Sequence, residues 1–285
     1  MQIVEVTHEY DTRLNATCRI VGLGDIHRGN PWFDEDHFYR TLDWIEENDC
    51  KVILMGDYGE CINAKDPRHD YNAIDWEYAT PDKQYMKVTE DLERIKHKCI
   101  MMLEGNHESN FWRRHNHNYT SGMAKALDIP YVGISGYILL RFKHLTKEGK
   151  PATRRIFRIY AHHGWAGGRS DGYKVKVIQD LRNIFDDAHL YMMGHTHKRG
   201  SVFPTTTLRV NARTKKIQDH DKNYVYTGSY IKGHEVGKGS YVEARAYPPT
   251  QLGSPLIEIR PKITGGTSDR TTSAFSVRCV DLDWV

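Results

Sequence analysis

Short apolar runs that stop at glycine alternate with amphipathic helical patterns over the first half of the chain. Residues 17–24 (TCRIVGLG) and 51–56 (KVILMG) are two such runs, and they are typical of buried strands in a parallel or mixed sheet. Between them, Asp34 can cap a helix whose apolar positions follow an i, i+3, i+4, i+7 spacing. Those positions are Phe38, Thr41, Leu42 and Ile45. The pattern predicts a strand, a crossover helix and a second strand.

The same alternation continues beyond this unit. A second helical pattern covers 81–97, and an apolar run at 99–103 predicts another strand. Residues 106–128 have a further helical pattern, which Gly122 weakens. Alternating strands and helices are the order found in α/β domains, so we expect that fold class here.

The second half of the chain is richer in strand patterns. Segments 137–142 and 154–161 alternate apolar and polar residues and flank a charged, hairpin-like stretch. The later elements predicted are a helix at 174–185 and strands at 189–193 and 224–227. We expect one domain over residues 1–285. Its β-rich part, 200–285, would complete a second sheet or form a small cap.

Composition limits the class of protein without naming a substrate. The chain has 285 residues, of which 39% are hydrophobic and 27% charged, as in folded globular proteins. It has no apolar stretch of about 18 residues and no secretory signal pattern at its start, so we expect no membrane helix. The five cysteines form no CxxC pair, which favours a reducing cytoplasm and argues against Cys-bound zinc. A formal charge of +3 is too small to indicate nucleic acid by itself.

Polar residues of metal-binding types follow directly after several of the apolar runs. Loops at the strand ends of an α/β sheet are where functional groups gather, so we expect these residues to converge. In chain order they are Asp25 and His27 (GDIH), Asp57 (GDYGE), Asn106 and His107 (GNHE), His162 and His163 (AHHG), and His195 and His197 (GHTH).

These residue types match the needs of a two-metal site. Two divalent cations about 3.5–4 Å apart need one bridging carboxylate, with imidazole, carboxylate or amide oxygen filling the rest of each shell. In Asp25-x-His27 and His195-x-His197, the spacing of two lets both side chains leave an extended loop on one side. Nitrogen and oxygen ligands without thiolate favour manganese, iron, zinc or nickel.

The ordered motifs resemble those of the calcineurin-like metallophosphoesterase superfamily. That family's signature is D-x-H, G-D, G-N-H-[DE], a strand-terminal H, and G-H-x-H, and here it runs in the same order from Asp25 to His197. The resemblance implies the family's fold, an α/β sandwich of two mixed sheets flanked by helices in four αββα layers. It also implies metal-dependent phosphoester hydrolysis with two divalent ions, manganese being the first choice.

The resemblance assigns a role to each matched residue. The first metal would be held by Asp25, His27 and His197 together with Asp57, which would bridge to the second. The other ligands of the second metal would be Asn106, His195 and the histidine before glycine in AHHG, which is His163, with His162 as the possible substitute.

Two further residues would assist the reaction in this family. His107 would donate a proton to the leaving-group oxygen while a hydroxide that bridges the metals attacks phosphorus. Glu60 stands three residues after Asp57, where the Ser/Thr phosphatase branch has a carboxylate that orients this histidine. In that branch an arginine follows to grip phosphate, but here Cys61 takes its place, which argues against a protein phosphatase.

The sequence leaves more than one class of substrate open. The missing arginine favours a phosphodiester, and an excess of basic residues over 198–222 is compatible with a nucleic-acid partner. Trp32, Trp112 and Trp165 could stack on bases or belong to the core, and Gly167-Gly168-Arg169 could face phosphate or form a plain turn. A phosphomonoesterase is the alternative, followed by a metal-binding scaffold without activity.

Overall fold

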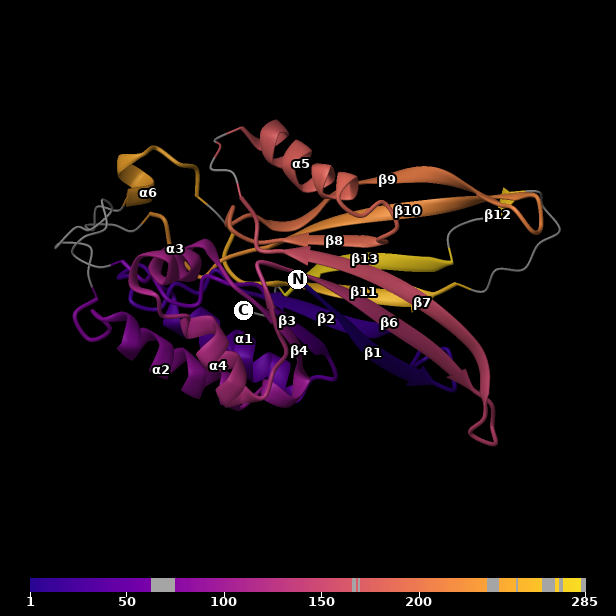
Figure 1. Cartoon of the computed structure of the whole chain (residues 1–285), viewed down its shortest axis with the longest axis horizontal. Coiled ribbons are helices and arrows are strands. Elements are labelled where there is room, and N and C mark those ends of the chain that lie inside the picture. Colours follow the sequence, from indigo (N-terminus) through magenta and orange to yellow (C-terminus); the bar gives the residue numbers. More distant parts are fainter. Residues whose placement is uncertain are drawn as a thin grey trace.

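Two β-sheets face each other in the computed structural model, with helices on their outer sides (Figure 1). The structure describes residues 1–62, 75–165, 168, 170–234, 241–249, 251–262, 270–271 and 274–282. One sheet has the strand order β13-β11-β2-β3-β4-β5, and the other has the order β1-β6-β7-β8-β10-β12 with β9 paired to β10. Both sheets are mixed, so the predicted fold class is confirmed.

The sheet that contains β2 is parallel at its centre and antiparallel at one edge. β2, β3, β4 and β5 run parallel to one another, because helices or long connections separate them along the chain. β11 pairs antiparallel with both β2 and β13. The strands are β2 (Cys18–Leu23), β3 (Lys51–Leu54), β4 (Cys99–Leu103), β5 (Tyr131–Gly133), β11 (Pro255–Pro261) and β13 (Phe275–Asp281).

The other sheet contains two long hairpins. β6 pairs antiparallel with β7, and β9 pairs antiparallel with β10, while β7, β8 and β10 run parallel. Its strands are β1 (Gln2–Tyr10), β6 (Ser135–Leu145), β7 (Pro151–His162), β8 (Leu190–Met193), β9 (Arg199–Asn211), β10 (Lys216–Thr227) and β12 (Arg270–Thr271). The β-rich region 200–285 therefore contributes strands to both sheets.

Helices cover the outer face of each sheet (Figure 1). α1, α2 and α4 lie on the sheet that contains β2, and α5 lies on the other sheet. The helices are α1 (Glu35–Glu47), α2 (Pro81–Glu93), α3 (Asn106–His115), α4 (Tyr119–Leu127), α5 (Asp171–Asp180) and α6 (Tyr241–Ala244), with 3-10 turns at Lys96–Lys98 and Leu181–Asn183. Among the described residues, no helix is long and apolar enough to span a bilayer.

Alternation of side chains along the strands separates three apolar layers. Val52 and Leu54 of β3 face the layer under α1, α2 and α4, whereas Ile53 between them faces the opposite sheet. A third layer, rich in tyrosine, lies between the second sheet and α5. Three layers of buried side chains between four layers of secondary structure correspond to the predicted αββα order.

Two elements differ from the sequence prediction. The single helix expected over 106–128 is two helices, because Asn116 takes a left-handed conformation and Asn118 caps the second helix by accepting from Ser121 N. The chain also begins with β1, which was not predicted. The predicted cap of α1 is present, since Asp34 Oδ1 accepts from His37 N at 3.1 Å.

Candidate functional site

The loops that follow β2, β3, β4, β7 and β8 meet at one end of the two sheets. Parallel strands place their carboxyl ends at the same edge, so loops from distant parts of the sequence come together there. Every predicted metal ligand, and also the predicted proton donor His107, lies in these loops or at the start of α3. They are Asp25, His27, Asp57, Asn106, His107, His163, His195 and His197.

The first group of possible ligands consists of Asp25, His27 and His197. His197 Nε2 lies 3.2 Å from His27 Nε2 and 3.6 Å from Asp25 Oδ1, although 170 residues separate the two histidines in sequence. The potential ligand atoms of the three residues all lie within 4.8 Å of one another. Together with Asp57, these are the residues that the resemblance assigned to the first metal.

The second group surrounds the amide oxygen of Asn106. Asn106 Oδ1 lies 3.0 Å from His163 Nε2 and 2.6 Å from His195 Nδ1. His163 Nε2 also lies 3.3 Å from Asp57 Oδ2. These four residues are the ones that the sequence assigned to the second metal, and His195 would use its Nδ1 atom.

Asp57 lies between the two groups. Its Oδ2 atom is 3.7 Å from His27 Nε2 in the first group and 3.3 Å from His163 Nε2 in the second. Its other oxygen, Oδ1, accepts a hydrogen bond from His107 N at 3.0 Å. A single carboxylate oxygen is therefore shared by both groups, which is the geometry that a bridging ligand needs.

His163, and not His162, belongs to this cluster. The Nδ1 atom of His163 is 2.8 Å from the carbonyl oxygen of Met55, so Nδ1 carries a proton and Nε2 is the atom that would bind a metal ion. His162 accepts from Gly164 N at 2.8 Å, and its ring packs against that of Trp165. Of the two alternatives from the sequence, the geometry favours His163 as the ligand.

His107 lies beside Asp57 but has its own partner. Its Nδ1 atom is 2.5 Å from the main-chain carbonyl oxygen of Glu60, and the Glu60 carboxylate is 4.0 Å away. Glu60 Oε2 is closer to His27 Nδ1, at 3.1 Å, although the alignment is too poor for a hydrogen bond. Glu60 thus holds His107 mainly through the main chain and places its carboxylate between His107 and His27.

Five of the possible ligands have backbone conformations that side chains rarely adopt. A φ near +50° costs about 1–2 kcal/mol for a residue other than glycine, and such strain is concentrated at functional sites. Here the positive values occur where the loops turn to aim side chains at one centre. They belong to Asp25 (48°), His27 (54°), Asp57 (53°), His195 (63°) and His197 (55°).

Burial of two carboxylates makes the cluster attract positive charge. Burial is the main cause that raises the pKa of Asp25 to about 7. Burial also acts on Asp57, but the neighbouring His163 and His107 outweigh it and hold the pKa of Asp57 well below its usual value. The same carboxylates outweigh the burial of His163 and raise its pKa to about 10. Protons on the histidines thus balance the negative charge of the carboxylates, a role that bound metal cations would otherwise have.

Two of the four ligand histidines, His195 and His197, stay neutral for the opposite reason. Burial lowers the pKa of His195 to about 4, and burial together with the charge of His27 lowers the pKa of His197 well below its usual value. Neutral imidazole is the form that binds a metal. The donor set contains only nitrogen and oxygen, so it fits a pair of divalent transition-metal ions such as manganese, zinc or iron.

Glycine is required where two of these loops approach each other. A Cβ atom on Gly105 would lie 2.1 Å from Asp57 Oδ1 and 2.2 Å from Asp57 N, closer than any real contact. A Cβ on Gly194 would lie 2.6 Å from Asp25 Oδ2. The glycines of the GNHE and GHTH motifs therefore let the backbone pass next to the ligand carboxylates.

Sequence reasoning gave no role to Glu108, the last residue of GNHE. Its buried carboxylate accepts from Asp57 N at 3.0 Å, Tyr58 N at 2.7 Å and Gly105 N at 2.8 Å, and also from the Tyr85 hydroxyl. One side chain thus fastens the loop after β3 to the start of α3. The signals in the sequence were its place as the last residue of the G-N-H-[DE] motif and an acidic residue at the third position of a helix.

Other sequence candidates lie apart from the cluster. Trp32 is buried, whereas the side chains of Trp112 and Trp165 are 43% and 40% exposed. The basic region 198–222 forms the β9–β10 hairpin, which runs away from the site, so only its first residues lie near the metal ligands. Residues 167 and 169 of the predicted GGR turn lie outside the described residues.

The part of the chain that contains this cluster of possible ligands matches a known protein family. The family model described as calcineurin-like phosphoesterase matches residues 18–199, which include every possible ligand. No curated protein matches the chain. The solved structures that resemble it include vacuolar protein sorting 29 from Cryptosporidium parvum, with 13% identity, a TM-score of 0.39 and coverage of 92% of this chain and 98% of that one.

Two further structures are similar to a comparable degree. A predicted phosphoesterase from Streptococcus pneumoniae has 9% identity and a TM-score of 0.34, covering 93% of this chain and 89% of its own. A Vps29 complexed with Zn²⁺ from Entamoeba histolytica has 11% identity and a TM-score of 0.35, covering 92% and 98%. With the family model spanning well over half of its length and all of its ligand loops, the chain belongs to the calcineurin-like phosphoesterase family.

Proposed function

We propose that the protein hydrolyses phosphodiesters with two divalent cations, held by Asp25, His27 and His197 on one side and by Asn106, His163 and His195 on the other. Membership of the family supplies the general activity, which is metal-dependent phosphoester hydrolysis. The observation that carries the finer proposal is the position of Asp57 Oδ2, which faces a histidine from each group at 3.3 and 3.7 Å.

The side chains of the site define how a phosphoryl group would be received. When bound, two such cations neutralise charge on the phosphoryl oxygens and lower the pKa of water from about 15.7 to about 7. Asp57 keeps its orientation because its second oxygen accepts from His107 N and its own N–H is held by Glu108. Asp25 is fixed in the same way, since both of its oxygens lie 3.0 Å from His195 N.

His107 is the proton donor in this proposal. A carbonyl oxygen can only accept, so the 2.5 Å contact with Glu60 O requires a proton on Nδ1 of His107. A second proton on Nε2 makes the ring an imidazolium that can protonate a departing alkoxide. The Glu60 carboxylate stays ionised beside it: the charges of His107 and His27 overcome the effect of burial and lower the pKa of Glu60 to about 2.

A diester is favoured over a monoester because described residues supply no arginine clamp at the site. Cys61 stands where the protein phosphatases have arginine; it is buried, and its Sγ contacts the Tyr85 hydroxyl at 3.0 Å. Arg28 follows a ligand but is turned to Glu35 and Asp91. A monoester carries one more negative charge than a diester and gains more from such a clamp.

An exposed aromatic ring next to the site supports a nucleotide-type diester. Trp165 follows His163 by two residues, is 40% exposed, and packs edge-on against His162 with ring centroids 5.2 Å apart. A partly exposed tryptophan held in this way offers a surface on which a base can stack.

Model substrates test the proposal. With added manganese, we expect turnover of bis-p-nitrophenyl phosphate to exceed that of p-nitrophenyl phosphate, and the Asn106→Ala variant to lose at least about 100-fold. A preference for the monoester would overturn the choice of diester. Inactivity on both, with two metal ions bound by elemental analysis, would overturn hydrolysis and point to a scaffold.

A further inference from the structure

A cavity lies at the opposite end of the sheets from the metal ligands. Its volume is 690 Å³, which is within the range of small-molecule sites, about 300–1,000 Å³. Ala16 lines it just before β2 begins, whereas Asp25 follows the other end of β2. Nine residues at about 3.3 Å each place the cavity some 25–30 Å from the metal ligands. It is therefore separate from the site described above.

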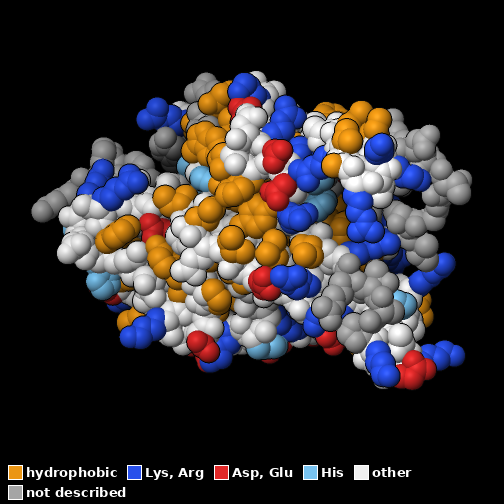
Figure 2. All heavy atoms as spheres, turned by 45° about the vertical axis from the view of Figure 1, so that its right-hand side comes forward, with side chains coloured by type: hydrophobic (Ala, Val, Ile, Leu, Met, Phe, Trp, Pro, Cys, Tyr) orange, Lys and Arg blue, Asp and Glu red, His pale blue; other side chains and the backbone are white. Residues whose placement is uncertain are grey.

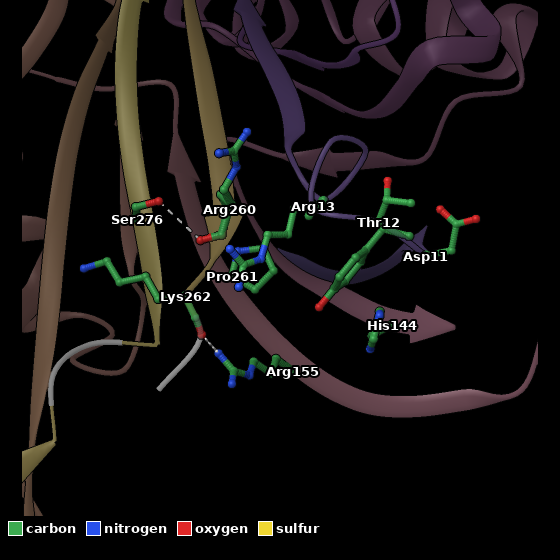
Figure 3. A pocket seen from close by; sticks show the side chains of 11 residues that line it. Asp11, Thr12, Arg13, His144, Arg155, Arg260, Pro261, Lys262 and Ser276 are labelled. Carbon is green, nitrogen blue, oxygen red and sulfur yellow. Dashed lines mark hydrogen bonds between the residues drawn. The ribbon is translucent and has the colours of Figure 1, made fainter. Parts of the chain in front are cut away.

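The lining of this cavity is strongly basic. Arg13, Arg155, Arg260 and Lys262 come from three segments that are distant in sequence and line the same cavity (Figure 3). Among the described residues of the lining, the one acidic side chain is Asp11, which accepts from Asn15 Nδ2 at 2.8 Å. The end of the molecule that Figure 2 brings forward carries more Lys and Arg side chains than Asp and Glu.

Three of these cations have no acidic partner among the residues that the structure describes. Within the described part of the chain, no ion pair neutralises Arg13, Arg260 or Lys262, although ion pairs are common elsewhere on the surface. Like charges gathered around one opening repel one another, which costs stability unless an anion binds between them. The arrangement therefore indicates an anionic ligand.

Hydrogen bonds hold part of the basic rim in place. Arg155 donates to the carbonyl oxygens of Lys262 and Ala274, which ties β7 to the segment after β11. Among the described residues, the Arg260 side chain has one hydrogen-bond partner: its Nε donates to Thr17 Oγ1 at 2.8 Å. Its two terminal nitrogens remain available, and a guanidinium in that state can hold a phosphate group through two parallel hydrogen bonds.

An aromatic wall stands beside the cations. The rings of Tyr10 and His144 are stacked, with centroids 5.2 Å apart and an interplanar angle of 27°. Tyr10 also packs edge-on against Phe142, a fully buried core residue. Both Tyr10 and His144 line the cavity. The cavity thus combines cations, of which Arg155 and Arg260 are held by hydrogen bonds, with a flat ring that is backed by the core.

We propose that this cavity binds a phosphorylated small molecule of nucleotide size, with its phosphates at Arg13, Arg260 and Lys262 and its ring against Tyr10. The volume admits one nucleotide. Guanidinium groups recognise phosphate, and the face of an aromatic side chain recognises a planar ring. The site would act independently of hydrolysis at the metal cluster.

Calorimetric titration of the full-length, metal-loaded protein tests this proposal. The probe is α,β-methylene-ADP, whose bridging carbon resists hydrolysis, and pyrophosphate is the probe for the phosphates alone. We expect Arg13→Ala/Lys262→Ala to weaken α,β-methylene-ADP binding at least about tenfold, and Tyr10→Leu to bring its affinity close to that of pyrophosphate. Turnover of bis-p-nitrophenyl phosphate should be unchanged in both variants.

A matched control removes the same two charges elsewhere. Arg40 and Lys125 are exposed on α1 and α4, so Arg40→Ala/Lys125→Ala should bind the nucleotide analogue like the unaltered protein. Equal weakening in the control would reduce the effect to overall charge and overturn the proposal. So would the absence of binding, an unchanged affinity in Arg13→Ala/Lys262→Ala, or equal affinity of the unaltered protein for pyrophosphate and the analogue.

Discussion

The Nδ1 atom of His107 lies 2.5 Å from the main-chain carbonyl oxygen of Glu60, while the carboxylate of the same residue is 4.0 Å away. The main chain thus fixes the tautomer and the direction of the ring, and the carboxylate supplies negative charge without taking the proton. Side-chain replacement of Glu60 leaves the carbonyl contact in place, so the orientation of His107 depends on the loop more than on the identity of residue 60.

Replacing His107 should affect substrates according to their leaving group. The His107→Asn variant is expected to lose about 10²–10⁴-fold in kcat on a diester with an alkoxide leaving group, because that oxygen needs a proton as it departs. The loss should be much smaller with p-nitrophenoxide, a stable anion. Steady-state kinetics on the two substrates measure the difference, and an equal loss on both would contradict the role of proton donor. Metal content should be unchanged.

His197 and His163 should differ from His162 in metal binding. His197 faces His27 at 3.2 Å and His163 faces Asp57 at 3.3 Å, so alanine at either position is expected to lower the manganese content from about two ions per chain to about one. The neighbouring His162→Ala should keep both ions. Elemental analysis after gel filtration gives the ratio, and metal loss in His162→Ala alone would reverse the assignment within AHHG.

Two glycine-to-alanine changes should have opposite effects on stability. In Gly105→Ala the new methyl group would meet the backbone and carboxylate of Asp57, which cannot retreat, so we expect a loss of about 2 kcal/mol or more in the free energy of unfolding. Gly122 is exposed in α4 with nothing within 4 Å of an added Cβ, and Gly122→Ala should gain about 0.5–1 kcal/mol. Urea denaturation of both variants measures whether the free energy of unfolding falls in one and rises in the other.

Stability should fall in mild acid because of a pair of histidines outside the metal site. The rings of His189 and His220 lie 4.7 Å apart, and burial lowers the pKa of His189 to about 3 and that of His220 to about 4. Below about pH 6.5 the unfolded chain binds protons that the folded chain does not, so the free energy of unfolding falls as pH drops toward 4. Thermal melts from pH 7 to 5 should show a falling Tm.

A variant isolates the part of this effect that comes from His220. His220 Nε2 donates to the carbonyl oxygen of Ala188 at 3.2 Å, and glutamine can keep a donor there without titrating. We expect the His220→Gln protein to have a shallower decline of Tm with falling pH than the unaltered protein. The same change at exposed His115 serves as the control, and parallel curves for all three proteins would refute the assignment.

Much of the fold could be predicted because the hydrophobic pattern of each segment agreed with the strand or helix that the segment forms in the folded protein. The apolar runs that end at glycine before Asp25 and Asp57 became β2 and β3, and the ligand motifs after them met as expected from parallel strands. The break between α3 and α4 rests on a left-handed Asn116 and on Asn118 as the next cap, and it was missed because the prediction followed the helical pattern on either side of these two residues. Glu108 was missed because its partners are main-chain N–H groups on another loop.

The distant cavity could not have been found in the sequence. Arg13, Arg155 and Lys262 stand more than 100 residues apart and share no spacing, so only the closure of the two sheets brings them together. The basic region 198–222, which does stand out in the sequence, follows a hairpin that leads away from the metal ligands. Charge density along a chain is a poor guide to charge density in space when strands are long.

The left-handed conformations of the five possible ligands have a consequence for metal selectivity. Loops that already hold energetically costly shapes, tied by hydrogen bonds such as His195 N to Asp25, have little freedom to adjust when an ion arrives. A pliable site would adapt its radius to manganese, zinc or iron alike. In this protein the loops fix the ligand positions before an ion binds. We therefore expect the site to discriminate between these ions by their size and their preferred coordination number.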